Sequence, residues 1–295
     1  MNGRGTLYIV ATPIGNLGDM TPRAVATLKN AALIAAEDTR TSAPLLRRFD
    51  ISTSMVSYHK FNERSRAESL VAELENGRDV ALISDAGTPC LSDPGHILTS
   101  LALAHGIEVV PIAGACALAA ALSVCGFALD SFAFYGFFPR ENARVKALLS
   151  LMTADSAPVA VLYESPKRVY RTIDSLGVSF PAGLLCVCND LTKKFERIYR
   201  GTAGDVLASL AANQDAGKGE YTLVLQKNYT PPETSPAASL SAEGLLADAM
   251  AKRPLTLREA VDAVCAESGG KLRKNEVYAA ALRLKTLFAA TEESQ

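Results

Sequence analysis

Short apolar runs alternate with amphipathic segments along the first 112 residues of the chain. The runs are apolar throughout, which is typical of strands that are covered on both faces of a sheet. Strands are predicted at 7–11, 33–36, 55–58, 80–83 and 108–111. Helices are predicted between them, at 22–30, 43–49, 62–76 and 96 to about 106. This alternation predicts a mostly parallel sheet with helices on both sides, so 1–112 is expected to form an N-terminal α/β domain.

The pattern changes after residue 112. A helix rich in small residues is predicted at 115–124 and a second, basic helix from 140. Further strands are predicted at 132–138, 159–163, 184–188, 197–200 and 221–225. Because their connections are shorter and less regular, we expect residues 113–228 to form a second α/β domain with a mixed sheet.

The last part of the chain has a different composition. Residues 229–240 are rich in Pro, Ser and Thr and are predicted to be a linker. Residues 241–295 are expected to form a small helical module, with amphipathic helices at 255–266 and 274–288. Such a module is either a binding module or a helix pair that packs on the main body.

Charge and composition exclude several classes of protein. The 30 Lys and Arg residues balance 31 Asp and Glu residues, which excludes a histone-like, uniformly basic nucleic-acid binder. No apolar run approaches the roughly 20 residues that span a bilayer, and the N-terminus leads directly into a predicted strand, so we expect a cytoplasmic protein without membrane contact. The three histidines stand apart and the six cysteines form no C-x-x-C pair, so no metal site is expected.

Three segments rich in Gly, Pro or other small residues follow predicted strands, at 12–17, 84–89 and 112–115. Loops at the carboxyl ends of parallel strands converge on the ligand crevice of an open α/β sheet. Glycine in such loops allows the backbone to approach a ligand closely, so the three segments together predict a pocket. The chain has neither the G-x-x-x-x-G-K-[ST] nor the G-x-G-x-x-G pattern, so the pocket is not a typical nucleotide-phosphate site.

Five segments occur in a distinctive order: 12–17 (TPIGNL), 37–40 (EDTR), 84–95 (SDAGTPCLSDPG), 163–166 (YESP) and 191–196 (LTKKFE). In these segments the chain resembles the bacterial small-subunit ribosomal RNA methyltransferase I family, ribose-2′-O-methyltransferases of the tetrapyrrole methylase superfamily. The resemblance covers about residues 6 to 226. It implies two α/β domains with S-adenosylmethionine bound in the cleft between them, and a homodimer. The implied target is a cytidine in the decoding region of 16S rRNA, within the 30S subunit.

The resemblance also implies roles for individual residues. The expected donor-binding residues are Thr12, Pro13, Gly15, Asp85, Thr88, Cys116, Ala117 and Tyr163. Asp85 would hold the polar part of the donor; alternatively, it is a carboxylate that caps a helix or a turn.

Methyl transfer to a ribose hydroxyl requires a near-attack geometry and benefits from a general base or a cation that stabilises the alkoxide. The candidates are Glu164, Lys167 and Asp38, followed by Glu37, Arg40 and Arg168. Alternatively, Glu164 caps the helix that begins near Pro166, and Lys167 is solvated.

Contacts with RNA require exposed cations. The residues expected to contact RNA are Arg40, Arg168, Lys193 and Lys194, and the last two are expected to touch phosphate. Segments 37–40 and 191–196 match the RNA enzymes specifically, which favours an RNA substrate over a tetrapyrrole or a protein substrate.

The chain departs from the family pattern at three places. Segment 113–117 is AGACA where the family usually has PGPSA, residues 189–190 are Asn-Asp where Arg-Glu is common, and Lys167 replaces a residue that is often His. Because of these departures, a second function is considered, that of a non-catalytic RNA-binding factor that retains the donor pocket.

Overall fold

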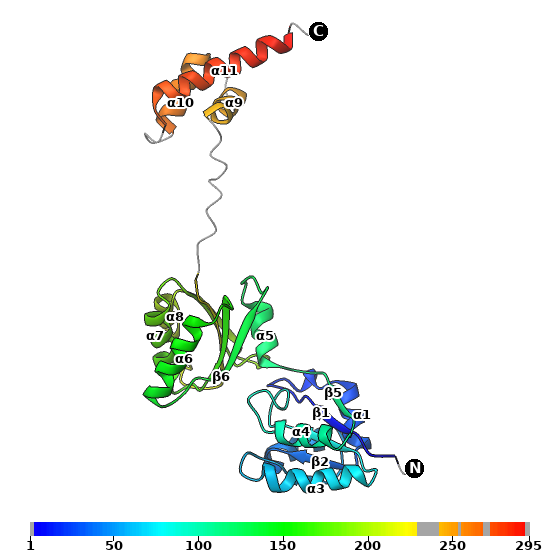
Figure 1. Cartoon of the computed structure of the whole chain (residues 1–295). Helices are drawn as coiled ribbons and strands as arrows, with labels where there is room; N and C mark the ends of the chain where they lie inside the picture. Colours follow the sequence, from blue (N-terminus) through cyan, green and yellow to red (C-terminus); the bar gives the residue numbers. More distant parts are fainter. Residues whose placement is uncertain (1–2, 229–241, 253–254, 268–271, 293–295) are drawn as a thin grey trace. The chain divides into compact units, whose positions relative to one another are not determined.

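The computed structural model describes residues 3–228, 242–252, 255–267 and 272–292 (Figure 1). The chain divides into two compact units, Met1–Tyr229 and Thr230–Gln295, and each is described by itself. The predicted linker at 229–240 lies outside the described residues. Among the described helices, none combines the length and the apolar character needed to cross a membrane.

The first lobe of the large unit is a parallel sheet in the order β3-β2-β4-β1-β5. Its strands are β1 (Leu7–Val10), β2 (Leu33–Ala36), β3 (Met55–Ser57), β4 (Val80–Ile83) and β5 (Val109–Ile112). Its helices are α1 (Pro22–Asn30), α2 (Thr39–Arg48), α3 (Glu63–Glu75) and α4 (His96–Ala104). Residues of α3 and α4 pack with one face of the sheet, and residues of α1 and α2 pack with the other. The expected parallel, doubly covered sheet is therefore present.

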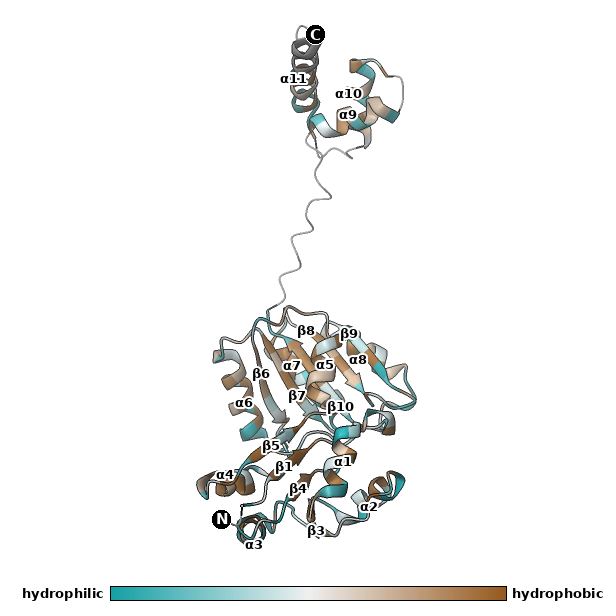
Figure 2. Ribbon diagram, turned by 90° about the vertical axis from the view of Figure 1, so that its right-hand side faces the viewer, coloured by the Kyte–Doolittle hydropathy of each residue, from teal (hydrophilic) through white to brown (hydrophobic). Residues whose placement is uncertain are grey.

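Side chains of single strands supply both of these cores. In β4, Val80 and Leu82 belong to the cluster with α3 and α4, whereas Ala81 and Ile83 belong to the cluster with α1 and α2. Successive side chains of a strand point to opposite faces, so a strand that is covered on both sides must be apolar at every position. This explains why the first-lobe strands form uninterrupted apolar runs, which Figure 2 shows as hydrophobic ribbons.

The second lobe is a mixed sheet in the order β6-β7-β10-β8-β9, in which β6 and β7 are parallel and the other pairs are antiparallel. Its strands are β6 (Phe132–Phe137), β7 (Val159–Glu164), β8 (Leu184–Asn189), β9 (Arg197–Gly201) and β10 (Tyr221–Gln226). Helix α5 (Ala117–Val124) covers one face. The other face is covered by α6 (Asn142–Ala154), α7 (Val169–Ser179) and α8 (Ala203–Ala211), as Figure 1 shows.

Two helices of the large unit differ from the sequence expectation. Helix α2 begins at Thr39 rather than at 43, because Asp38 caps it by accepting a hydrogen bond from the backbone N–H of Arg40 at 2.8 Å. Helix α8 was not expected; its N-terminus is a capping box formed by Thr202 and Asp205. Both starts therefore depend on side-chain caps rather than on apolar periodicity.

The small unit contains three described helices, α9 (Ala242–Lys252), α10 (Leu257–Glu267) and α11 (Lys274–Glu292). They pack around a cluster that includes Leu246, Val261, Val264 and Val277. Two of the helices were expected. The prediction missed α9, whose apolar residues follow the stretch rich in Pro and Ser without an intervening signal.

Candidate functional site

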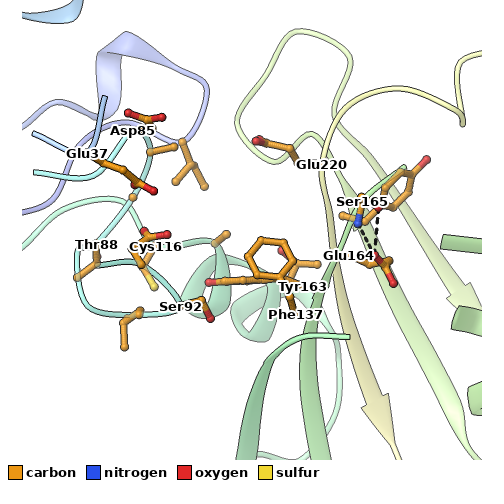
Figure 3. A pocket seen from close by; sticks show the side chains of 18 of the residues that line it. Glu37, Asp85, Thr88, Ser92, Cys116, Phe137, Tyr163, Glu164, Ser165 and Glu220 are labelled. Atoms are coloured by element: carbon orange, nitrogen blue, oxygen red, sulfur yellow. Dashed lines mark hydrogen bonds between the residues drawn. The ribbon is translucent and has the colours of Figure 1, made fainter. Parts of the chain in front are cut away.

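A cleft of about 570 Å³ lies where strand-end loops of the first lobe meet the second lobe. This volume is within the range of small-molecule sites in proteins. The first lobe contributes the loops after β2 and β4, and the second lobe contributes the ends of β6 and β7 and the start of β10. Figure 3 shows Glu37, Asp85, Thr88 and Cys116 on one side of the cleft and Glu220 on the other.

The loops after β1 and β4 are joined by backbone hydrogen bonds. The N–H of Thr12 donates to the carbonyl of Gly87 at 2.9 Å, and the N–H of Gly87 donates to the carbonyl of Thr12 at 3.0 Å. The buried hydroxyl of Thr12 donates to the carbonyl of Ser84 at 3.1 Å. Thr12 is therefore placed beneath the cleft as a residue that holds its loops, whereas Gly87 lines the cleft directly.

Three carboxylates of the first lobe line the cleft: Glu37, Asp85 and Asp93. Burial raises the pKa of Glu37, and the neighbouring Asp85 raises it further. Burial also raises the pKa of Asp85. For Asp93, burial and then the charge of Glu37 raise the pKa to about 6. The cleft therefore favours either protonated carboxyls or a positively charged ligand. In the described part of the chain, no group of three His, Cys, Asp or Glu side chains is arranged to hold a metal ion.

The opposite wall is aromatic. The rings of Phe137 and Tyr163 meet edge to face with centroids 5.5 Å apart, and both residues line the cleft. The hydroxyl of Tyr163 accepts a hydrogen bond from the N–H of Leu118 at 3.2 Å, which ties β7 to the first turn of α5. Phe137 remains 57% exposed. The cleft thus offers a ring surface on one side and acidic side chains on the other, which suits a ligand with a flat apolar part and a cationic part.

Small residues complete the wall between these two sides. Cys116 precedes the first residue of α5, Ala117, and both line the cleft. The hydroxyl of Thr88 donates to the carbonyl of Ala115 at 3.1 Å and so connects the loop after β4 to the segment after β5. Because these side chains are short, the backbone of both loops is close to the space of the cleft.

Glu164 is placed differently from what a general base needs. It lies in the wall of the cleft, but its side chain is fully buried. One carboxylate oxygen accepts hydrogen bonds from the N–H and the hydroxyl of Ser165 and lies 2.5 Å from Arg168, as shown in part in Figure 3. The other oxygen accepts a hydrogen bond from Thr172 at 2.6 Å. The carboxylate is therefore fully engaged with its own lobe.

The other proposed catalytic residues lie outside the cleft lining. Lys167 is exposed on the surface. Asp38 caps α2 and forms an ion pair with Arg40 at 2.7 Å; its hydrogen bonds with Arg40 lower its pKa to about 2. Arg40 itself is exposed, as expected for an RNA contact. Neither Lys167 nor Asp38 lines the cleft, and the lowered pKa of Asp38 makes its carboxylate a weak base.

The loop after β8 forms part of the rim. Lys193 forms ion pairs with Asp190 at 2.7 Å and with Glu220, which lines the cleft, at 3.0 Å. Its side chain also occupies the space where a side chain at Gly15 would have to lie. Lys194 is exposed and lies over the ring of Phe195, 5.3 Å from its centroid. Pro13 is half-buried and is not a lining residue of the cleft.

Of the predicted donor-binding residues, Asp85, Thr88, Cys116, Ala117 and Tyr163 line the cleft, whereas Thr12, Pro13 and Gly15 are not among its lining residues. Sequence reasoning did not assign Asp93, Ser92, Phe137 and Glu220 to the site. Asp93 and Ser92 lie within the 84–95 segment, so their position after a predicted strand could have indicated them. Phe137 and Glu220 carry no comparable signal.

Comparisons with known proteins agree with this architecture. Residues 6–207 match the family described as Tetrapyrrole (Corrin/Porphyrin) Methylases. A relative from Synechocystis sp. is 42% identical over 285 residues, covering 95% of this chain and 99% of the relative. A relative from Escherichia coli O157:H7 is 37% identical over 282 residues, covering 95% and 96%. Both relatives are named ribosomal RNA small subunit methyltransferase I.

Solved structures show the same fold at low sequence identity. A diphthine synthase covers 75% of this chain and 90% of its own, with a TM-score of 0.57 and 14% identity. A uroporphyrin-III C-methyltransferase from Thermus thermophilus, complexed with S-adenosylhomocysteine, covers 76% and 98%, with a TM-score of 0.52 and 17% identity. The fold and the family expected from the sequence are both confirmed. This chain belongs to the tetrapyrrole methylase family, and within it to the group of the ribosomal RNA small subunit methyltransferases I.

Proposed function

We propose that this chain transfers the methyl group of S-adenosylmethionine to the ribose 2′-oxygen of a cytidine in 16S rRNA, in the decoding region of the 30S subunit. The observation that carries the proposal is the composition of the cleft, with acidic side chains on one wall and an aromatic surface on the other. The relatives named ribosomal RNA small subunit methyltransferase I support an rRNA substrate. With a ribosomal substrate, the proposed activity is cytoplasmic.

The residues present fit this methyl donor. Its sulfonium is a cation. Burial raises the pKa values of Glu37, Asp85 and Asp93, so their ionised forms are disfavoured in the empty cleft and are stabilised when a cation binds beside them. Phe137 and Tyr163 provide a flat apolar surface for a purine ring. We assign Asp85, Thr88, Cys116, Ala117 and Tyr163 to donor binding, as the family resemblance implies.

The departure at 113–117 does not disturb this region. A side chain at Gly114 would lie 2.9 Å from the Cβ atom of Ala11, so the glycine that the close packing requires is kept. Cys116 takes the place of the usual serine and still lines the cleft. This local fit supports donor binding, and methyl transfer to 30S subunits separates the enzyme from a non-catalytic RNA-binding factor that retains the donor pocket.

The donor supplies a methyl carbon that is open to in-line displacement. With the thioether as leaving group, the methyl would pass to the ribose oxygen, and the protein would supply a base for the proton of the hydroxyl. Glu37 and Asp93 are the carboxylates best suited to accept this proton, because both line the cleft and both have raised pKa values. Glu164 acts instead as a positioning residue that fixes the end of β7 through Arg168 and Thr172.

Donor binding, methyl transfer, product analysis and variant kinetics test the proposal. Isothermal titration calorimetry should detect S-adenosylmethionine binding, and purified 30S subunits from a strain without this methyltransferase should accept the methyl group. Mass mapping of the rRNA nucleosides should place the methyl on the ribose of one cytidine. Glu37→Gln and Asp93→Asn should lower kcat while the rRNA remains bound. Absence of donor binding would overturn the assignment of the cleft, and methyl transfer to a base would overturn the ribose target.

The homodimer expected from the family resemblance stays a prediction. Analytical ultracentrifugation of the full chain tests it directly.

A further inference from the structure

The most exposed large apolar side chain among the described residues is Phe61, which is 94% exposed. It lies in the short connection between β3 and α3. The turn is held by side-chain hydrogen bonds: the N–H of His59 donates to the side-chain oxygen of Asn62 at 2.8 Å, and the amide nitrogen of Asn62 donates to the carbonyl of Ser57 at 3.2 Å. The ring is therefore presented to solvent by an ordered turn.

Phe61 has basic neighbours on the same exposed segment. Lys60 precedes it, and Arg64 follows in the first turn of α3; both are exposed. The nearby carboxylate of Glu63 is buried and accepts a hydrogen bond from the N–H of Gly95 at 3.0 Å. The ring of Phe61 meets the ring of His59 edge to face, with centroids 6.0 Å apart, and is otherwise exposed. The local surface thus combines an exposed ring with two exposed cations.

Phe195 has the same character on the second lobe, in the connection between β8 and β9. Its ring is 71% exposed and lies against the ammonium group of Lys194. The loop is fixed by Lys193, which binds Asp190, and by the N–H of Thr192, which donates to Glu196 at 2.5 Å. Arg197 is also exposed.

Each ring neighbours a residue that interacts with a lining residue of the cleft. His59, which the Phe61 ring contacts, lies near enough to the cleft residue Glu37 to lower its pKa. Next to Phe195, Lys193 pairs with the cleft residue Glu220 and packs against Gly15, which follows β1. In the first sheet β3 and β1 are three strand positions apart, so the ends of these two strands are separated by about 14 Å. Several consecutive nucleotides cover such a distance.

We infer that Phe61 and Phe195 are stacking platforms on which unpaired bases of the rRNA substrate rest, one on each side of the cleft. An exposed aromatic ring beside Lys and Arg is the combination by which proteins bind single-stranded nucleic acid, because every base has a flat face and every linkage has a negative charge. Held in this way, the strand passes over the cleft with its bases splayed, so that a ribose hydroxyl faces the cleft. The inference rests on the proposed rRNA substrate.

The variants distinguish the effect of the aromatic ring from the effect of an apolar side chain. Phe61→Leu and Phe195→Leu remove the ring, whereas Phe61→Tyr and Phe195→Tyr keep it. Leu103→Ala is the matched control, since Leu103 is exposed near the end of α4, on the sheet edge away from the cleft. Each Leu variant should raise the KM for 30S subunits roughly tenfold. The KM values of the Tyr variants and of the control should stay within about twofold of that of the unchanged protein, since all of these variants keep both aromatic rings.

Two further readouts accompany the kinetics. The dissociation constant for S-adenosylmethionine should be unchanged in all variants. Ultraviolet irradiation of the complex with 30S subunits, followed by mass spectrometry, should give nucleotide adducts on the peptides that contain Phe61 and Phe195.

The outcomes are distinguishable. If the unchanged protein methylates 30S subunits and the Leu variants do so equally well, the stacking inference fails alone. If the unchanged protein neither binds nor methylates 30S subunits, the proposed function fails. A changed sedimentation coefficient in the Leu variants would assign the rings to an interface between copies and overturn the inference.

Discussion

The guanidinium of Arg168 lies 2.5 Å from the carboxylate of Glu164, whose side chain has no exposed surface. Arg168 also donates to the carbonyls of Phe138 and Pro139, at 3.0 Å and 3.1 Å. One side chain therefore joins the end of β7, the start of α7 and the segment after β6. Phe137, which precedes these carbonyls, lines the cleft, so the ion pair holds the aromatic wall in place.

Removal of this guanidinium should destabilise the fold. Arg168→Ala leaves the buried carboxylate of Glu164 without its cation, and breaking a buried pair in this way costs about 3 kcal/mol. Urea denaturation should show a loss of this size in the free energy of unfolding. Arg144→Ala is the control, because Arg144 and Glu141 form an exposed pair at 3.3 Å and its loss should cost less than about 0.5 kcal/mol. Equal losses in the two variants would contradict a structural role for the buried pair.

The pH dependence of methyl transfer should report Asp93. Its pKa is raised to about 6 by burial and by Glu37, and only the ionised carboxylate can accept a proton. We expect kcat/KM to rise with pH through about 6 and then to level off. Asp205→Asn should leave this profile unchanged, because Asp205 caps α8 outside the cleft lining. A flat profile between pH 5 and 7 would exclude Asp93 as the base.

The same carboxyl should affect stability with a definite sign. Because the pKa of Asp93 is higher in the folded protein than its ordinary value of 3.8, its ionisation disfavours the folded state. Its contribution to the free energy of unfolding is therefore greatest below pH 4 and is lost as the pH rises through about 6. Asp93→Asn should remove this dependence and make the protein more stable at pH 7. Thermal denaturation at pH 4.5 and pH 7 measures the difference, and an Asn variant that is less stable at pH 7 would contradict it.

Gly87 should be intolerant of a side chain. Its φ of +81° lies in the left-handed region, and a Cβ atom there would lie 3.2 Å from the Cγ2 atom of Ile14. Gly87→Ala should lower the free energy of unfolding by about 1–2 kcal/mol. It should also weaken donor binding, because Gly87 carries the hydrogen bonds to Thr12 that shape the cleft. Gly217→Ala is the control, since a Cβ atom there would meet nothing within 4 Å. Calorimetric donor affinity equal to that of the control would contradict the prediction.

The sequence was sufficient to predict the side of the cleft that parallel topology assembles. Asp85, Thr88 and Cys116 each follow a first-lobe strand closely, and the ends of parallel strands meet at one edge whatever the details of packing. The motif order then identified the family. Predictions of this kind depend on features of short continuous segments, such as an apolar strand and the motif that follows it.

The remaining site residues depend on contacts that no local segment encodes. Phe137 reaches the cleft because the register of β6 on β7 shifts between Phe134 and Phe137, where Gly136 has a φ of +67°. From the sequence, Glu164 is expected to be an accessible carboxylate, but tertiary packing buries it beside Arg168. Hydrophobic periodicity indicates neither the bulge nor the burial. It therefore cannot distinguish a positioning carboxylate from a catalytic one.

The two neighbouring lysines of the rim should respond differently to substitution. Lys193 is engaged by Asp190 and Glu220, and burial and these two carboxylates act on its pKa in opposite directions, with a net rise. Lys194 has an exposed ammonium group beside Phe195. Lys194→Ala should therefore weaken binding to 30S subunits and reduce the slope of log affinity against log salt by about 0.7, the value for one phosphate contact on a single strand.

Lys193→Ala should leave that salt slope nearly unchanged, because its charge is already neutralised within the protein. It should instead strengthen donor binding, since it leaves the negative charge of Glu220 unpaired in the lining of the cleft, where it attracts the cationic donor. Filter binding at several salt concentrations and donor calorimetry measure the two effects. Equal reductions of the salt slope by both substitutions would mean that Lys193 leaves its ion pairs to contact phosphate, as the sequence alone had suggested.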